Sequence, residues 1–513
     1  MVKQHRLYLP VIFLVLALAG WLAVANAPEM DFNFQAWANW GIGLLLTLLI
    51  VIWFVFLSGL TWKTRLWGLF MLLASAGLLR AALRVDGSVS GTGLPRFRWF
   101  WTEPESKQFV QMKAAQAPSL VADADFPQFL GPQRDGIVPV SEDYTLEGAE
   151  LLWRQPIGEG WGAFCVVGHR AMTQEQRGDE EWVTCYDLGT GAALWHHADK
   201  TRFVEWQGGD GPRATPSHRE GKVYAIGATG NLNCLHLETG EVLWSADILG
   251  KAGRKNLKWG ISGSPLLHKD LVIVTGGDIP GPTLLAFDAA SGQLKWEAEK
   301  VAASYASPSL ATIGGKEVLI YSAAPGIYLH DPMTGAVLHF EKWGNANFPK
   351  GSQPTVLPQD RVFISAGYSM GCTMFQYSVD AAGEFTATEL WSHNKMKTQF
   401  ASVTYWEGHL YGLDDGKIAC LNAETGERLW KTGRYGAGVH LMLTGEGQGP
   451  RALIQSEEGP VHLLTLAPKE PTELGQLAAL SSKTWNYPTP AGNVLLCRND
   501  REAACYRLAK KAN

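Results

Sequence analysis

The sequence has little charge, and it lacks several motifs that define common enzymes. Only 18% of its 513 residues are charged and the formal net charge is −5, so nothing indicates a nucleic-acid partner. With 46% hydrophobic residues, the chain is too apolar to be disordered. It has no H-E-x-x-H, no C-x-x-C-H, no P-loop, and no G-x-S-x-G or G-x-G-x-x-G in the required strand-to-helix context. We therefore expect no metal site and no common nucleotide or nucleophile chemistry.

Three apolar segments lie within residues 1–85. Residues 7–27 and 40–60 are each 21 residues long and uncharged, enough to cross a hydrocarbon core about 30 Å thick. Residues 66–83 contain a single charge, Arg80, which lies near one end and can reach the headgroups. We predict three transmembrane spans. Alternatively, residues 7–27 are a signal peptide, because Ala25-Asn26-Ala27 resembles a cleavage site.

The basic residues around these segments predict their orientation. Lys3 and Arg6 precede the first segment, and Lys63 and Arg65 lie between the second and third. The positive-inside rule then places the N-terminus in the cytoplasm, and three spans place the remainder of the chain outside it. If residues 66–83 lay flat on the membrane, the remainder would be cytoplasmic.

Residues 86–124 are predicted to be an interfacial segment and a tether. Residues 96–101 read Arg-Phe-Arg-Trp-Phe-Trp, an alternation of cationic and aromatic side chains that suits the membrane interface. Residues 102–124 are rich in Ala, Gln and Glu and indicate a flexible connection.

A hairpin repeat predicts the fold of the rest of the chain. Its copies share an apolar strand end, a Thr-Gly or Ser-Gly turn and a strand closing on an aromatic residue: YDLGTGAALW (186–195), HLETGEVLW (236–244), FDAASGQLKW (287–296), HDPMTGAVLHF (330–340) and LNAETGERLW (421–430). Residues 379–385, with Trp391 after them, form a degenerate copy. The closing aromatic residues are 39 to 52 residues apart, the length of a four-stranded propeller blade.

This spacing predicts an all-β, eight-bladed propeller of four-stranded antiparallel blades over residues 149–510, with a degraded blade around residues 462–477. Residues 149–155 look like an outer strand without a hairpin before it, and residues 505–508 look like an inner strand without an outer one after it. We expect these two strands to pair and close the ring, which removes exposed sheet edges. We expect residues 125–148, a pre-propeller segment, to be dispensable for closure.

The repeat resembles that of pyrroloquinoline quinone (PQQ) dehydrogenases and their non-catalytic relatives, including the propeller lipoprotein of the outer-membrane β-barrel assembly machinery. Residues 125–137, 211–216 and 227–230 also look like a bacterial family of PQQ-binding-like propeller repeat proteins, in which some members carry an N-terminal anchor. The resemblance implies a bacterial inner-membrane protein with its propeller in the periplasm. It says little about activity, because fold and function separate readily.

The resemblance raises the question of whether PQQ is bound. PQQ alcohol dehydrogenases have a vicinal disulfide, but none of the seven cysteines here adjoins another. No carboxylate-rich Ca²⁺ loop is visible. The membrane glucose dehydrogenases of the superfamily also lack the disulfide, so a dehydrogenase remains an alternative. In that reading Trp259 or Trp161 would stack on the cofactor, and Arg213 or Lys258 would meet its carboxylates.

Repeat positions give the cysteines and tryptophans a structural interpretation. Cys185, Cys234, Cys420 and Cys505 occupy equivalent strand positions and are predicted to be buried, while Cys497 and Cys505 could pair within one blade. The closing tryptophans are predicted to pack between blades.

Candidate binding residues lie before the innermost strands. Arg213, Tyr305 and Gln399 precede small residues there and can point into the central funnel. The long connections 196–212 and 245–261 reach the same face. The full candidate set is Trp161, Glu205, Trp206, Asp210, Arg213, Lys258, Trp259, Tyr305 and Gln399.

These observations favour a membrane-anchored, extracytoplasmic propeller that binds a protein partner at one face and acts as a scaffold without catalysis. No cofactor is predicted. The alternative is a PQQ- and Ca²⁺-dependent membrane dehydrogenase that oxidises an alcohol or sugar and passes electrons to quinone.

Overall fold

The chain forms two compact units. The computed structural model describes residues 8–27, 30, 32–88, 94–101, 120–250, 253–279, 281–445 and 447–510. One unit comprises residues 1–104 with the short segment 206–208, and the other comprises residues 105–205 and 209–513. Of the predicted tether over residues 102–124, residues 102–119 lie outside the described residues.

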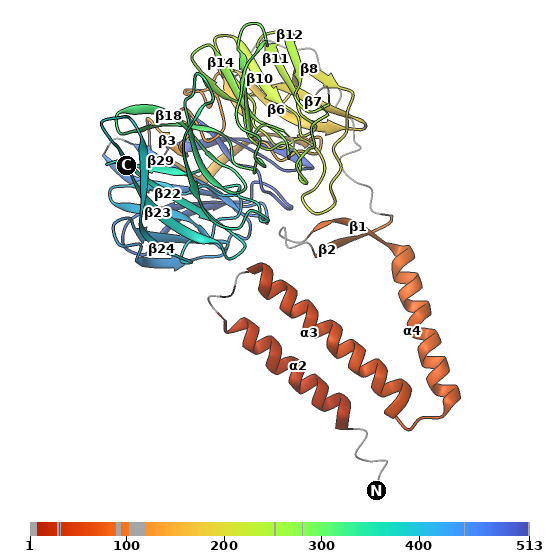
Figure 1. Ribbon diagram of the computed structural model, residues 1–513. Helices are drawn as coiled ribbons and strands as arrows, with labels where there is room; N and C mark the ends of the chain where they lie inside the picture. Colours follow the sequence, from red (N-terminus) through yellow and green to blue (C-terminus); the bar gives the residue numbers. More distant parts are fainter. Residues whose placement is uncertain are drawn as a thin grey trace. The chain divides into compact units, whose positions relative to one another are not determined.

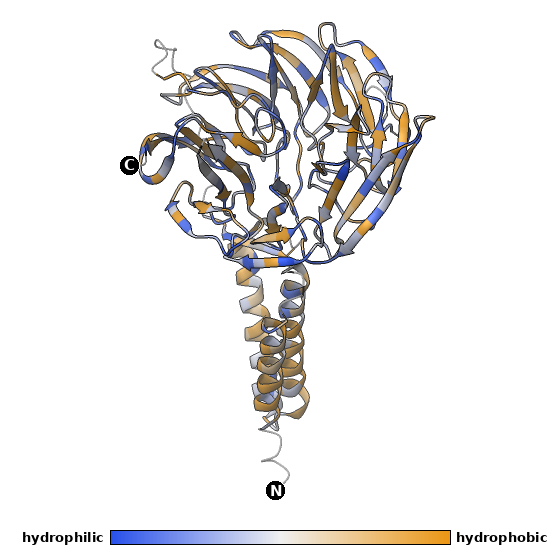
Figure 2. Ribbon diagram, turned by 90° about the vertical axis from the view of Figure 1, so that its left-hand side faces the viewer, coloured by the Kyte–Doolittle hydropathy of each residue, from blue (hydrophilic) through white to orange (hydrophobic). Residues whose placement is uncertain are grey.

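The N-terminal unit contains three apolar helices, α2 (Leu9–Ala25), α3 (Phe32–Ile52) and α4 (Trp62–Ala82), with α3 continued by a π-helical turn η2 (Trp53–Leu57) (Figures 1 and 2). Two of these segments are long and apolar enough to cross a membrane, Phe34–Leu57 with 24 residues and Trp62–Ala82 with 21. The third, α2, has 17 residues. The predicted segment 66–83 is therefore a full-length helix, and the shortest of the three is the first.

A two-stranded antiparallel hairpin follows α4 in the same unit. Strand β1 (Leu83–Ser88) begins at the residue after the helix ends, and β2 (Pro95–Trp99) pairs with it. The cationic and aromatic segment predicted to be interfacial thus includes most of a β-strand.

The second unit is an eight-bladed propeller, as the repeat predicts. Blade 1 consists of β5 (Cys165–Val167), β6 (Arg170–Arg177), β7 (Glu180–Asp187) and β8 (Ala193–Asp199), and blade 2 of β9 (Ser217–Arg219), β10 (Lys222–Ile226), β11 (Asn231–His236) and β12 (Val242–Asp247). Blade 3 consists of β13 (Leu266–His268), β14 (Leu271–Thr275), β15 (Leu284–Asp288) and β16 (Leu294–Glu297), and blade 4 of β17 (Ser309–Ile313), β18 (Lys316–Ser322), β19 (Gly326–His330) and β20 (Val337–Lys342).

Blades 5 to 8 complete the ring. Blade 5 consists of β21 (Thr355–Leu357), β22 (Arg361–Ala366), β23 (Gly371–Val379) and β24 (Phe385–His393), and blade 6 of β25 (Thr404–Trp406), β26 (His409–Asp414), β27 (Lys417–Asn422) and β28 (Arg428–Thr432). Blade 7 consists of β29 (Val439–Gly445), β30 (Gln448–Gln455), β31 (Val461–Thr465) and β32 (Glu473–Leu477), and blade 8 of β33 (Thr489–Ala491), β34 (Val494–Arg498), β35 (Glu502–Lys510) and β4 (Tyr144–Pro156). The degraded repeat predicted near residues 462–477 is the outer half of blade 7.

The repeat residues lock each blade to the next. The turn glycines have left-handed backbones, for example Gly292 at φ 71°. The Trp244 ring of the preceding blade lies directly on this glycine, so that a Cβ there would come within 2.6 Å of it. The Trp244 indole N–H also donates to Ala289 O in the same turn, at 3.1 Å. Equivalent bonds run from Trp153, Trp195, Trp391 and Trp430 to the next blade. The tryptophans pack between blades, as predicted.

Strand pairing between β35 and β4 closes the ring, with Trp153 opposite Cys505 and Leu151 opposite Tyr506. This confirms the predicted closure, but β4 begins at Tyr144 rather than at 149. The preceding segment is also part of the ring, because β3 (Ile137–Pro139) pairs in parallel with β29 as a fifth strand. Phe126, Leu130 and Val138 are buried in the core. These contacts argue against the expectation that residues 125–148 are dispensable for closure, since their removal would expose this core.

The seven cysteines are all free and buried. Burial raises the pKa of the Cys234 thiol to about 11 and of the Cys420 thiol to about 12. Cys497 is paired in register with Ala504, not with Cys505, so the disulfide considered from the sequence does not form.

We predict that Gly292→Ala lowers the free energy of unfolding by about 3 kcal/mol, because the new methyl group must take a left-handed backbone and also displace the Trp244 ring. Gly221→Ala is the matched control: its φ is 74° but nothing lies within 4 Å of the added Cβ. It should cost only about 1–2 kcal/mol. Urea unfolding of the two variants measures the difference, and equal midpoints would contradict the proposed lock.

Candidate functional site

The connections that lead from the outermost strand of one blade to the innermost strand of the next lie on one face, here called the connection face. Hydroxyl groups join neighbouring blades where these connections end. Thr215 Oγ1 accepts from Ala163 N (3.0 Å), and Ser264 Oγ accepts from Thr215 N (2.9 Å). Ser307 Oγ in turn accepts from Ser264 N (2.9 Å). The small residues predicted at the axis thus also hold the connections in place.

Four sequence-predicted residues come together in the connection between blades 1 and 2. Trp161 Nε1 donates to Asp210 O (3.0 Å), and Glu205 N donates to Asp210 Oδ1 (3.0 Å). The Arg213 guanidinium donates to Gly209 O and Gly211 O, both at 2.6 Å, and lies 4.9 Å from the Phe203 ring centre. Burial lowers the pKa of Arg213 to about 10, an effect that Glu205 and Asp210 oppose.

Lys258, Trp259 and Tyr305 form a second group, on the connections that enter blades 3 and 4. The Trp259 and Tyr305 ring centres are 5.3 Å apart, and Trp259 N donates to the Tyr305 hydroxyl at 3.4 Å. Lys258 Nζ lies 4.6 Å from the centre of the Trp259 ring. Trp259 and Tyr305 are half-buried, and Lys258 is exposed.

The remaining two predicted residues do not join these groups through the contacts described. The Gln399 side chain packs against Gly367 of blade 5, where an added Cβ would lie 3.0 Å from Gln399 Cγ. Trp206 is grouped with the N-terminal unit and is 51% exposed.

Sequence reasoning missed an aromatic cluster beside Trp161. Trp485 lies 5.0 Å from both Trp161 and Phe400 between ring centres. Lys483 Nζ lies 4.6 Å from the Trp161 ring centre and 4.3 Å from that of Trp485. The available signal was that Phe400 and Trp485 precede innermost strands, although neither is at the repeat position of Arg213, Tyr305 and Gln399.

A strained turn also presents an aromatic side chain on this face. Residues 367–371 read Gly-Tyr-Ser-Met-Gly, which has G-x-S-x-G spacing, but they join β22 to β23 rather than a strand to a helix. Tyr368 and Ser369 have φ values of 57° and 61°. This is a hairpin turn and not a nucleophile elbow. Tyr368 stacks on Phe348 at 5.6 Å and 4°, and such strain often marks a functional position.

The residues selected for PQQ make other contacts in the structure. Trp161 is buried, with Trp485 beside it and Gly209 so close that a Cβ there would lie 2.4 Å from its ring. Arg213 already donates to two backbone carbonyls, and Lys258 lies over the Trp259 ring that would have to stack on the cofactor. Within the described part of the chain, no group of three or more His, Cys, Asp or Glu residues could hold a metal ion.

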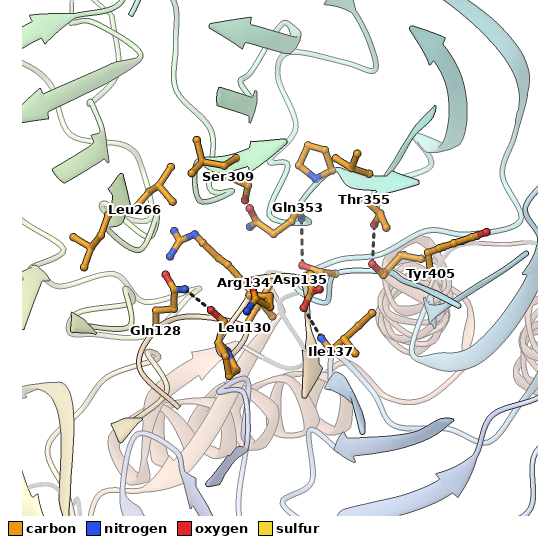
Figure 3. A pocket seen from close by; sticks show the side chains of 18 residues that line it. Gln128, Leu130, Arg134, Asp135, Ile137, Leu266, Ser309, Gln353, Thr355 and Tyr405 are labelled. Atoms are coloured by element: carbon orange, nitrogen blue, oxygen red, sulfur yellow. Dashed lines mark hydrogen bonds between the residues drawn. The ribbon is translucent and has the colours of Figure 1, made fainter. Parts of the chain in front are cut away.

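A groove of about 470 Å³ lies along the innermost strands of blades 3 to 6, where residues 128–137 pass them (Figure 3). Arg134 forms one wall and donates to Ser264 O (2.6 Å), Pro265 O (3.1 Å) and Pro308 O (3.1 Å). Burial lowers the pKa of Arg134 to about 9 and raises that of Asp135. No local sequence pattern indicates this groove, because its walls are more than 100 residues apart in the chain.

The fold and the site define the class of protein: an eight-bladed propeller with PQQ-like repeats. Residues 179–432 match the family model described as outer membrane protein assembly factor BamB. The chain is therefore similar to this family over about half of its length.

Individual proteins are also similar to the chain in sequence or in fold. A BamB from Bordetella pertussis (strain Tohama I) is 23% identical over 328 residues, covering 61% of this chain and 75% of that protein. The crystal structure of BamB from Moraxella catarrhalis has a TM-score of 0.51 and 16% identity, covering 71% of this chain and 99% of that one. A europium-containing methanol dehydrogenase has a TM-score of 0.46 and 13% identity, covering 73% and 89%.

The buried carboxyl group of Glu181, which interacts electrostatically with Arg213, predicts that the stability of the propeller depends on pH. Glu181 accepts hydrogen bonds from Ala228 N (3.1 Å) and Thr229 Oγ1 (2.8 Å), and burial raises its pKa to about 7. The unfolded value lies near 4.3. The folded chain thus binds more protons than the unfolded chain between these values, so stability should fall as pH rises through this window.

Between pH 4 and pH 8, we predict that the free energy of unfolding falls by about 3 kcal/mol less in Glu181→Gln than in the unmodified protein, because the amide does not ionise. Urea unfolding across this pH range measures it. Glu241→Gln, at an exposed position, should follow the unmodified protein. Parallel pH profiles for Glu181→Gln and the unmodified protein would refute the assignment.

Proposed function

We propose that this protein is a membrane-anchored, extracytoplasmic scaffold whose propeller binds a protein partner through the connection face and catalyses no reaction. The observation that carries the proposal is the row of incompletely buried aromatic rings on that face: Trp259, Tyr305, Phe348, Tyr368, Phe400 and Trp485. Aromatic side chains dominate binding energy at protein interfaces because they bury large areas at low entropic cost.

The chemistry of the face supports binding over catalysis. The cations Arg213, Lys258 and Lys483 lie against aromatic rings, so they stabilise the surface rather than face a substrate pocket. The relatives described as outer membrane protein assembly factors support a role in a protein assembly. The proposed partner is therefore a protein, with the bilayer as the support.

The proposed location is the bacterial inner membrane, with the propeller in the periplasm. Three helices precede the propeller, and Lys3, Arg6, Lys63 and Arg65 lie at the ends that this topology places in the cytoplasm, whereas the four arginines of residues 80–101 lie at the outer end. An odd number of crossings then carries the chain outward.

An alkaline phosphatase fused after Asn513 is expected to be active, because this reporter matures only outside the cytoplasm. A matched fusion within the loop before α4, after Leu60, should be inactive. Activity of the Leu60 fusion with none after Asn513 would contradict the proposed topology and would indicate that α2, the shortest helix, does not cross.

The binding face is tested by a photo-crosslinking amino acid at Phe348, which is 38% exposed, with Leu243 on the outer strand β12, 44% exposed, as the matched control. We expect a protein adduct of defined mass from position 348 only. In parallel, the detergent-solubilised chain with PQQ and Ca²⁺ should reduce no dye with alcohols or sugars. Adducts from both positions would argue against the face, and PQQ-dependent turnover would establish the dehydrogenase instead.

A further inference from the structure

The hairpin β1–β2 separates its apolar and cationic side chains onto two faces. The register places Leu83 opposite Trp99, Arg84 opposite Arg98, and Val85 opposite Phe97. Directly paired residues share a face, and successive residues alternate between faces. One face therefore carries Leu83, Val85, Phe97 and Trp99, while the other carries the two arginines.

The apolar face is exposed to solvent. Val85, Phe97 and Trp99 are 54%, 49% and 45% exposed, and the following Trp101 is 60% exposed. Trp99 and Trp101 stack with their ring centres 4.9 Å apart and their planes at 8°. An exposed apolar patch of this kind beside a membrane helix needs an apolar partner.

The position of the hairpin is set by the chain itself. Helix α4 ends at Ala82, β1 begins at Leu83, and Phe100 N donates to Ala82 O at 2.8 Å. No loop separates helix from hairpin. If α4 crosses the bilayer, the hairpin therefore begins at the depth where the hydrocarbon ends.

The charges indicate which lipids would lie there. Residues 80–101 contain four arginines and one aspartate. Arg84 and Arg98 stand directly opposite each other on one face of the hairpin, so two positive charges lie close together there. Arginine binds phosphate groups through its planar fork of donors.

We propose that the β1–β2 hairpin is a lipid-binding element that lies in the bilayer interface, with its apolar face toward the acyl chains and its arginines at the level of the phosphates of anionic phospholipids. The element deepens the proposed function, because it rests on α4 crossing the membrane. It gives the anchor a preference for anionic lipid, which apolar helices alone do not supply.

The test uses the full chain reconstituted into vesicles and an environment-sensitive fluorophore attached at Phe97→Cys. The native cysteines are buried, so the label goes to the introduced thiol. Leu390→Cys on the outer strand β24, 46% exposed, is the control position. Vesicles contain either phosphatidylcholine alone or phosphatidylcholine with phosphatidylglycerol, and spin-labelled lipids quench fluorophores that enter the interface.

We expect strong quenching at position 97 in the anionic vesicles, weaker quenching in phosphatidylcholine alone, and little quenching at position 390. Arg84→Gln with Arg98→Gln should reduce the immersed fraction in anionic vesicles toward its value in phosphatidylcholine. Each arginine should contribute about a fivefold change in the immersion equilibrium. An unchanged thermal midpoint of the double variant shows that the propeller remains folded.

Two results would overturn the proposal. Equal, weak quenching at positions 97 and 390 would show that the hairpin does not lie in lipid. If quenching at position 97 were the same in both kinds of vesicle and in the double arginine variant, the proposed preference for anionic lipid would be wrong. Washing the vesicles at alkaline pH tests separately whether the helices anchor the chain in the membrane. A chain that resists extraction while Phe97→Cys stays unquenched overturns the hairpin alone, whereas a chain released from vesicles overturns both proposals.

Discussion

The contact of a tryptophan ring with the turn glycine of the next blade is the constraint on which the propeller depends. It joins three requirements at one position: a left-handed backbone at the glycine, an absent side chain that lets the ring approach, and a carbonyl that accepts the indole N–H. The contact occurs at five of the eight junctions between blades, and at each of them one blade is positioned by its neighbour. The connections on the opposite side take no part in this contact, so their sequences can vary and form a binding face.

This difference between the repeated contacts and the variable connections explains which features could be predicted from the sequence. The blade count, the closing strand and the buried tryptophans were predictable because their signals are local and recur at a fixed spacing. The apolar helices were predictable from run length for the same reason. Even so, the start of β4 at Tyr144 was missed, since its extra residues follow no repeat.

The binding face was only partly predictable. Trp161, Asp210 and Arg213 do meet, because they lie on connections that the ring brings together. Trp485 and Lys483 were missed since their contacts with Trp161 join residues more than 300 apart in the sequence. The groove beside Arg134 could not be predicted for the same reason, because its walls are far apart in the sequence and become neighbours only in the folded propeller.

Closure by β4 and β35 has a consequence for how the chain is made. Glu150 and Arg507, which form an ion pair across this seam, are 357 residues apart. At a synthesis rate of roughly 5–20 residues per second, the first strand of the ring waits about 20 to 70 seconds for its partner. During that interval its edge is unpaired and open to wrong pairings. Biogenesis of this protein therefore requires either early blades stable enough to shelter that strand or a chaperone that holds it until the last strand emerges.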